Sequence, residues 1–393
     1  MLVRGKHYAT GQVIDVHVNT EAGVIEAIAP LDASRAPELG GGSEFVAPGF
    51  FDIQVNGFAG VDFQNPAITA DDLAYATREQ LRHGTTQFLA TVVTGSHDEM
   101  VARLRALARA LDPRPELSSA VAGFHLEGPY LCAEEGPRGA HLREHLRPPS
   151  WAEFEKFQEA AGGRIAMVTL APELPGAMRF IEEAAAAGVV AAIGHTAADD
   201  RQIADAVTAG AKTSTHLGNG SHNTLPRHAN YIQVQLAEDR LMASFIADGH
   251  HLPPYAVKNF IRAKGVERSI LTTDAISAAG AQPGHYRCGA LEVETKEDGR
   301  VSLPGATCLA GSSATLEQCV GNVIAWAGLS VADAVRMVTE NPTVLLGRRR
   351  RVLEKGASAN LILFSRTDGH IRVNAAVVHG KVIFMDAKTR IIR

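Results

Sequence analysis

The sequence predicts a (β/α)8 barrel that carries a small β-sandwich domain built from both ends of the chain. Between residues 48 and 347, eight short apolar runs alternate with Ala-rich amphipathic segments. Such alternation indicates βα units, and eight units are typical of a closed parallel barrel. Residues 1–47 and 348–393 alternate between apolar and polar residues, as β-strands do. An open doubly wound sheet is the alternative, but no Gly-x-Gly-x-x-Gly motif follows the first barrel strand.

The expected elements follow this plan in chain order. The terminal pieces contribute alternating segments at 12–18, 23–28, 359–364 and 373–384. Barrel strands are expected at 50–55, 85–92, 121–126, 165–170, 189–193, 212–217, 241–246 and 269–273. The helices between them are expected at 71–83, 98–111, 151–161, 176–187, 199–209 and 253–263. A hairpin insertion is expected at 278–304, closing helices at 313–327 and 331–339, and a solvated basic turn at 348–351.

The composition is that of an ordinary globular protein. The 393 residues are 46% hydrophobic and 21% charged, which excludes bulk disorder. The net charge of -5 leaves no basic field for a nucleic-acid partner. The four cysteines have no paired spacing and are predicted to be reduced thiols. We expect a soluble, cytoplasmic protein, because the chain has neither a signal peptide nor a window of about 18 apolar residues.

The 16 histidines are the unusual feature of the composition, and several polar residues stand where expected strands end. Glu127 ends the third strand, His195 the fifth, His216 the sixth and Asp274 the eighth. In a barrel these strand ends open on one face, so the four side chains should converge. Two imidazoles and one carboxylate can hold a divalent metal; zinc suits them best, with iron or manganese as alternatives. Asp274 is then free to act as a general base.

The first strand favours one metal ion over two. It carries Asp52 and Gln54 where many metal-dependent barrels have His-x-His, and a neutral amide oxygen is a weak ligand. His125 precedes Glu127 by two residues and should face the same side of its strand. It is either a hydrogen-bonding neighbour of the metal site or a packed core histidine.

Several motifs recur in a fixed order along nearly the whole chain. They are APGFFDIQVNG from 47, HLEGPY from 125, TLAPE from 169, GHT from 194, THL from 215, IADGHH from 246, TTDA from 272, LAGSS from 309 and GASANLI from 356. In their number and order they resemble the N-acetylglucosamine-6-phosphate deacetylases of the amidohydrolase superfamily.

The resemblance implies a barrel enzyme that hydrolyses the acetamido group of an amino sugar phosphate and releases acetate. It implies that Glu127, His195 and His216 hold the metal. Asp274 would take a proton from water and return it to the departing amine, and His141 would help to stabilise the oxyanion. The implied substrate contacts are His141, Asn219, Gly220, His251 and Arg227. The family's role for Arg227 is to reach the phosphate of the neighbouring subunit, which implies a homodimer.

The loop after His216 departs from the family's pattern. It reads GNGSHNTLPRHAN from 218, without the family's Tyr-Asn-Ala-Met, and it adds His222 and His228. It is either a repacked loop with surface histidines or a change in sugar or phosphate recognition. An unphosphorylated or galacto-configured N-acetyl sugar is therefore an alternative substrate.

Two further functions are disfavoured. A cyclic-amide hydrolase would need the His-x-His pair on strand one. A non-enzymatic scaffold should have lost metal ligands, but all four candidate residues are present.

Overall fold

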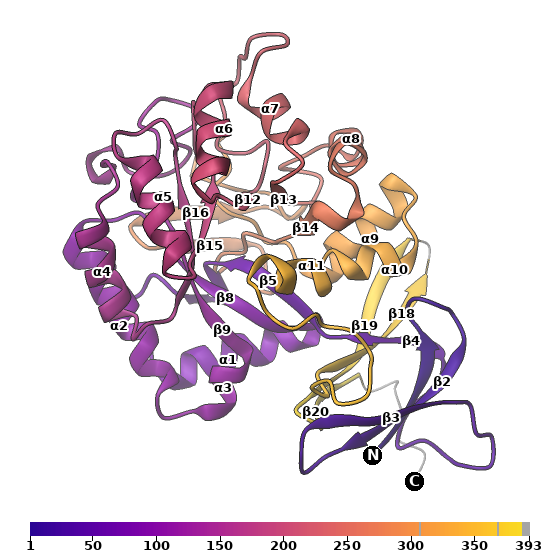
Figure 1. Cartoon of the computed structure of the whole chain (residues 1–393). Coiled ribbons are helices and arrows are strands. Elements are labelled where there is room, and N and C mark those ends of the chain that lie inside the picture. Colours follow the sequence, from indigo (N-terminus) through magenta and orange to yellow (C-terminus); the bar gives the residue numbers. More distant parts are fainter. Residues whose placement is uncertain (306–307, 368, 387–393) are drawn as a thin grey trace.

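The computed structural model of this protein describes residues 1–305, 308–367 and 369–386. Eight parallel strands form the barrel (Figure 1). In order around the sheet they are β5 (Phe50–Val55), β8 (Thr85–Val93), β9 (Val121–Glu127), β10 (Ile165–Leu170), β11 (Val190–Ile193), β12 (Thr213–Ser214), β13 (Met242–Phe245) and β14 (Ser269–Leu271). A parallel bridge between Val55 and Ala275 joins the two ends of the sheet. The predicted barrel is confirmed.

The predicted sixth strand is the one that differs most from the structure. Residues 212–217 were expected to be extended, but β12 spans only Thr213–Ser214. The chain leaves the ladder at this point because His216 adopts a left-handed conformation with φ of 30°. The backbone turn that orients the His216 side chain therefore also ends the strand early.

Helices cover the outside of the barrel, and several of them have a polar side chain that caps the first turn. Capping boxes begin α1 (Ala70–Arg82), α2 (His97–Leu111) and α6 (Asp200–Ala209). The other expected helices are α4 (Trp151–Ala160), α5 (Ala177–Ala186), α8 (Pro254–Lys264), α9 (Leu316–Ala327) and α10 (Val331–Arg336). Five further short elements were not expected: α3 (Pro115–Ala120), α7 (Tyr231–Ala237), α11 (Glu340–Leu345) and the 3-10 turns η1 (Arg143–His145) and η2 (Val266–Arg268). None exceeds seven residues, too short for a helical period to show in the sequence.

Strands from both ends of the chain form the small domain, as expected (Figure 1). They are β1 (Leu2–His7), β2 (Val13–Asn19), β3 (Val24–Pro30), β4 (Leu39–Pro48), β18 (Leu361–Thr367), β19 (His370–Val378) and β20 (Lys381–Met385). All seven belong to one hydrogen-bonded sheet, in the order β20-β19-β18-β4-β1-β2-β3. The sheet curls back on itself, since Ile25 N donates to Ala357 O at 2.8 Å. We propose domain boundaries at 47/48 and 347/348, because β4 leads almost directly into β5.

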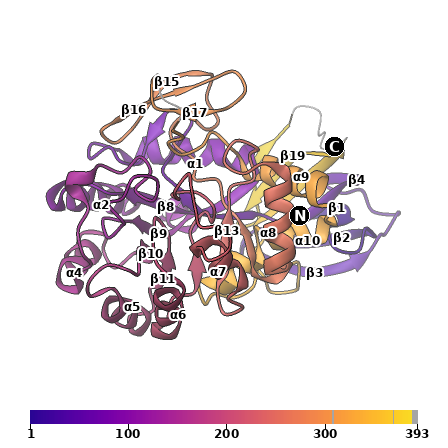
Figure 2. The same cartoon turned by 90° about the horizontal axis from the view of Figure 1, so that it is seen from above.

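The insertion after the eighth barrel strand is the expected hairpin. It contains β15 (Gly284–Cys288), β16 (Leu291–Thr295) and β17 (Val301–Ser302), paired antiparallel. Figure 2 shows it projecting from the edge of the barrel. A second small ribbon, β6 (Gly57–Phe58) with β7 (Val61–Asp62), follows the first barrel strand.

The inside of the barrel is filled with side chains. Phe51, Leu89, Met167 and Ile270 form a buried cluster there, and Leu345 of α11 packs into it. The barrel is therefore a packed core closed by α11 rather than a pore. The four cysteines are unpaired in the structure, and three of them are buried. Among the described residues, no helix has both the length and the apolar character needed to span a membrane.

Candidate active site

The four residues expected at strand ends are brought together at the carboxyl end of the barrel. Glu127 is the last residue of β9, and His195, His216 and Asp274 follow β11, β12 and β14 within three residues. His195, His216 and Asp274 have positive φ angles of 52°, 30° and 51°, which only five of the described non-glycine residues have. Such backbone costs on the order of 1 kcal/mol or more per residue and is concentrated at functional sites. The strained backbone at these three residues directs their side chains into the barrel mouth.

The donor atoms of three of these residues face one another. Glu127 Oε1 lies 3.2 Å from His195 Nε2 and 2.9 Å from His216 Nε2, and the two Nε2 atoms are 3.2 Å apart. All three side chains are buried. The structure therefore places one oxygen and two ring nitrogens around a single point.

The hydrogen bonding of His195 determines which ring nitrogen is available. Its Nδ1 lies 2.7 Å from the carbonyl oxygen of Pro137, an acceptor, so Nδ1 must carry the proton. The lone pair is then on Nε2, which faces Glu127 and His216. A ligating histidine held through its other ring nitrogen in this way is the usual arrangement in metal sites. These donors fit a divalent cation, and the Glu/His set is the kind that binds first-row transition metals.

Asp274 lies beside this cluster and is linked to it by an amide. Gln54 Nε2 donates to Asp274 Oδ1 at 3.0 Å and to Glu127 Oε1 at 2.9 Å. Asn56 Nδ2 donates to the same Asp274 oxygen at 2.7 Å. Gln54 therefore uses its nitrogen to hold two carboxylates near each other, which agrees with the expectation that it is not a metal ligand.

The two carboxyl groups have opposite pKa shifts. Burial raises the pKa of Asp274 to about 7, and the negative charge of Glu127 adds to this effect. Burial also opposes ionisation of Glu127, but its close contacts with the His195 and His216 rings outweigh burial and hold the pKa of Glu127 well below its usual range. Two neighbouring carboxyl groups with separated pKa values are typical of a site in which one is a fixed anion and the other exchanges protons.

Asp52 fixes the segment that carries Asp274. It is buried and accepts hydrogen bonds from Thr272 Oγ1 and Thr273 Oγ1, both at 2.6 Å. Burial raises the pKa of Asp52 to about 6, although these hydrogen bonds act in the opposite direction. Asp52 of the first strand therefore holds the end of β14 by hydrogen bonds.

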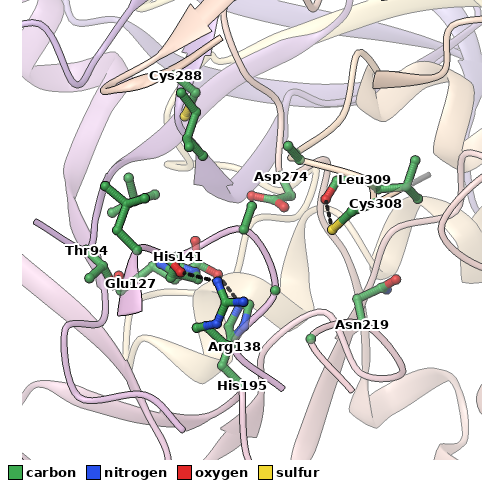
Figure 3. Close-up of a pocket in the computed structure, with 18 of the residues that line it drawn as sticks. Thr94, Glu127, Arg138, His141, His195, Asn219, Asp274, Cys288, Cys308 and Leu309 are labelled. Atoms are coloured by element: carbon green, nitrogen blue, oxygen red, sulfur yellow. Dashed lines mark hydrogen bonds and ion pairs between the residues drawn. The ribbon is translucent and has the colours of Figure 1, made fainter. Parts of the chain in front are cut away.

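A pocket of about 740 Å³ is lined by Asn56, Glu127, His195, His216 and Asp274 (Figure 3). His141, Asn219, Gly220 and His251 also line it, as expected of substrate contacts. The His141 ring lies 4.5 Å from the His195 ring, at an angle of 83°. Ligand atoms of Glu127, His141 and His195 lie within 4.8 Å of one another, so His141 is a fourth candidate donor beside the cluster. Burial lowers the pKa of His141 to about 3, which keeps this ring neutral.

His251 has a buried partner that the sequence did not reveal. Its Nδ1 lies 2.7 Å from Asp248 Oδ2, and both side chains are only 6% exposed. The spacing of three residues in the IADGHH motif was the available signal. Asn56 was missed for a similar reason, because an asparagine after a strand is ordinarily a turn residue.

Arg227 is the predicted substrate contact that does not reach the pocket of its own chain. It is exposed, in the loop between His216 and α7, and is not among the lining residues. His228 in the same loop is also exposed. His222 instead bonds to Tyr231 Oη at 3.0 Å and to Glu134 at 3.1 Å, so it joins this loop to the one that contains Pro137. His125 is a core histidine: it is fully buried, and its Nε2 lies 2.7 Å from Thr169 Oγ1.

Comparison with known proteins gives one consistent result. The sequence model of the amidohydrolase family matches residues 45–384. N-acetylglucosamine-6-phosphate deacetylase of Bos taurus is 34% identical over 370 residues, which cover 89% of this chain and 86% of that protein. The deacetylase of the same name from Bacillus subtilis is 31% identical, over 86% of this chain and 84% of that protein.

A solved structure leads to the same family. N-acetyl-D-glucosamine-6-phosphate deacetylase from Mycobacterium smegmatis, in complex with N-acetyl-D-glucosamine-6-phosphate, has a TM-score of 0.89 and 30% identity. The match covers 98% of this chain and 99% of that one. The chain therefore belongs to the amidohydrolase family and, within it, to the N-acetylglucosamine-6-phosphate deacetylases.

Proposed function

We propose that this protein is a metal-dependent deacetylase that converts N-acetylglucosamine 6-phosphate to glucosamine 6-phosphate and acetate. The observation that carries the proposal is the convergence of Glu127, His195 and His216 beside Asp274 in one pocket. Identity to enzymes of this name over most of the chain supports the substrate.

Glu127, His195 and His216 are the residues that would hold the metal. The family is metal-dependent, and we propose one ion, Zn²⁺, with Fe²⁺ or Mn²⁺ as alternatives. When bound, a divalent ion supplies Lewis acidity, which lowers the pKa of water and polarises an amide carbonyl. The single-ion proposal is supported by Gln54, whose amide nitrogen faces the two carboxylates.

Asp274 is the group proposed to move the proton. Its Oδ1 is held by Asn56 and Gln54, so the carboxylate is fixed in orientation beside the ligand cluster. It would accept a proton from the attacking water and deliver it to the nitrogen of the departing amine. One carboxylate then acts first as base and afterwards as acid.

His141 is proposed to stabilise the charge that develops on the acetyl oxygen. The neutral ring carries one N–H, which it can donate to that oxygen. Arg138 positions the segment, because its Nη1 donates to the carbonyl oxygen of His141 at 3.0 Å. Figure 3 shows Glu127, His141, Arg138 and His195 close together in the pocket.

The phosphate is proposed to be bound by His251, by the turn at Asn219 and Gly220, and by Arg227 of a neighbouring copy. A phosphate needs fixed N–H donors or cationic side chains, and these residues supply both. Arg227 is exposed and lies outside the pocket of its own chain, so its contribution would require a homodimer. We also place the enzyme in the cytoplasm, since its four cysteines are unpaired.

The deciding experiment compares acetate release from three substrates at low concentration. They are N-acetylglucosamine 6-phosphate, unphosphorylated N-acetylglucosamine and N-acetylgalactosamine 6-phosphate. We expect the first to be hydrolysed with the highest kcat/KM. Equal rates for the first two would contradict phosphate recognition, and a higher rate for the third would assign the galacto configuration.

A further inference from the structure

A second cavity lies at the opposite end of the barrel from the active site. It has a volume of about 350 Å³ and is lined by residues 348–352 together with residues of the barrel and the small domain. Four of the lining residues are the consecutive arginines 348–351, and no aspartate or glutamate is among them. Figure 1 shows the segment between α11 and β18 passing from the barrel to the small sheet. The cavity is therefore cationic, and it lies at the junction of the barrel and the small sheet.

Arg351 is oriented by neutral groups at the start of β8. Its Nη1 donates to Gln87 Oε1 and its Nη2 to Thr86 Oγ1, both at 3.0 Å. Gln87 is itself held, because its Nε2 donates to Ser119 O at 2.7 Å. Burial lowers the pKa of Arg351 to about 10, and no carboxylate among the described residues pairs with it. A cation taken out of water without a counter-ion is costly unless an anion joins it.

Arg348 also lacks a carboxylate partner among the described residues, although its side chain is more exposed than that of Arg351. Its Nη2 donates to the carbonyl oxygen of Ala122 at 2.6 Å, and its guanidinium lies 5.9 Å from the centre of the Phe51 ring. Burial lowers its pKa as well. Arg349 and Arg350, which lie between Arg348 and Arg351 in the sequence, do have acidic neighbours. Arg349 pairs with Glu354 at 2.7 Å, and Arg350 lies 3.9 Å from Glu340. The turn therefore contains two neutralised arginines and two that lack a carboxylate partner among the described residues. The expectation of a simple solvated turn was wrong for Arg351, which is half-buried.

We propose that this cavity binds a phosphate group, either inorganic phosphate or a small phosphate monoester, between Arg348 and Arg351. Guanidinium groups match phosphate oxygens with paired N–H donors, and two of them balance a dianion. Arg348 and Arg351 contact the beginnings of β8 and β9, whereas Glu127 lies at the carboxyl end of β9. The site is therefore separate from the proposed substrate pocket, and the two have no lining residue in common.

The proposal is tested by calorimetric titration of the full chain at fixed ionic strength, with inorganic phosphate in one arm and glycerol 3-phosphate in the other. Arg348→Gln and Arg351→Gln should each weaken binding at the cavity about tenfold or more, since a charged hydrogen-bonding partner is lost. Arg201→Gln is the matched control, because Arg201 is exposed on α6 and lies 3.9 Å from Asp205. Tighter binding of glycerol 3-phosphate would assign the cavity to a monoester, and tighter binding of inorganic phosphate to the free ion.

A further variant separates this cavity from the catalytic pocket. His251→Ala should retain phosphate binding at the cavity. If His251→Ala abolished binding while Arg348→Gln bound phosphate as Arg201→Gln does, phosphate would occupy the catalytic pocket alone and the proposal would be overturned. Arg351 is half-buried, so Arg351→Lys is measured beside Arg351→Gln; it keeps the charge but loses the paired N–H donors, and it is expected to weaken binding. Arg350→Gln should leave the affinity unchanged, because Arg350 already lies near Glu340. Unchanged affinity in both Arg348→Gln and Arg351→Lys would also overturn the proposal.

Discussion

The side-chain amide of Gln54 lies 3.0 Å from Asp274 and bridges it to Glu127, 2.9 Å away on the other side. A neutral donor between two carboxylates lessens their repulsion while leaving one of them able to exchange protons. This bridge joins the carboxyl ends of the first, third and eighth strands of the barrel.

Gln54→Leu should lower both metal affinity and kcat by about 10–100-fold, the usual effect of removing a hydrogen-bonding neighbour of a metal ligand. Metal affinity is measured by competition with a chelator and kcat by acetate release. Gln233→Leu is the control, because Gln233 is exposed on α7. Equal effects of the two substitutions would show that the bridge has no role.

Asp274→Asn should retain the metal and lose turnover, because the amide keeps the size of the side chain but cannot accept a proton from water. We expect acetate release to fall by about 10²–10⁴-fold. Elemental analysis of the purified variant gives the metal content in the same preparation. Normal turnover in Asp274→Asn would remove the proposed role of this residue.

Removal of the metal should abolish acetate release. Treatment with a chelator, followed by separate additions of Zn²⁺, Fe²⁺ and Mn²⁺, identifies the ion that restores the highest rate. His216→Gln should bind well under about half an equivalent of metal, because one of three ligands is lost. His228→Gln should bind metal normally, since His228 is exposed in the loop that follows. A chelated protein that is free of metal and fully active would contradict the proposal.

Asp52 should make the stability of the protein depend on pH. Its pKa is raised from 3.8 to about 6 in the folded protein, so folding favours the protonated form. The resulting stabilisation is fully present below the unfolded pKa and is lost as the pH rises through about 6. The shift corresponds to about 3 kcal/mol in the free energy of unfolding.

The measurement is urea unfolding of the wild type and of Asp52→Asn at about pH 4 and pH 7. Titration of other groups cancels in the difference between the two proteins. The wild type should gain stability relative to Asp52→Asn at the lower pH. A difference that does not change with pH would rule out a raised pKa for Asp52.

Arg227→Ala should raise KM for the phosphorylated sugar by about 10–100-fold, because a charged hydrogen bond to phosphate is lost. KM for the unphosphorylated sugar should not change, and light scattering should give a dimer. Arg201→Ala, on an exposed helix face, is the control for the loss of one charge. An active monomer with unaltered KM would contradict the role assigned to Arg227.

The strand–helix alternation and the positions of Glu127, His195, His216 and Asp274 could be predicted because they depend on local order in the chain. Apolar runs long enough to cross a barrel are visible in the sequence, and so are the polar residues at the ends of the third, fifth, sixth and eighth of these runs. The short helices α3, α7 and α11 could not be found in this way, because six or seven residues do not establish a period.

The sequence by itself determined the order of the barrel strands and the residue types that end them. The tertiary structure decided which atoms of those residues meet. Pro137 O selects the ring nitrogen that His195 presents, and Gln54 turns its amide between two carboxylates. Arg351 becomes half-buried at the far end of the barrel, where the sequence indicated an exposed turn. These outcomes depend on contacts between segments distant along the chain, so their energies follow from packing and burial in three dimensions and leave no periodic signal in the sequence.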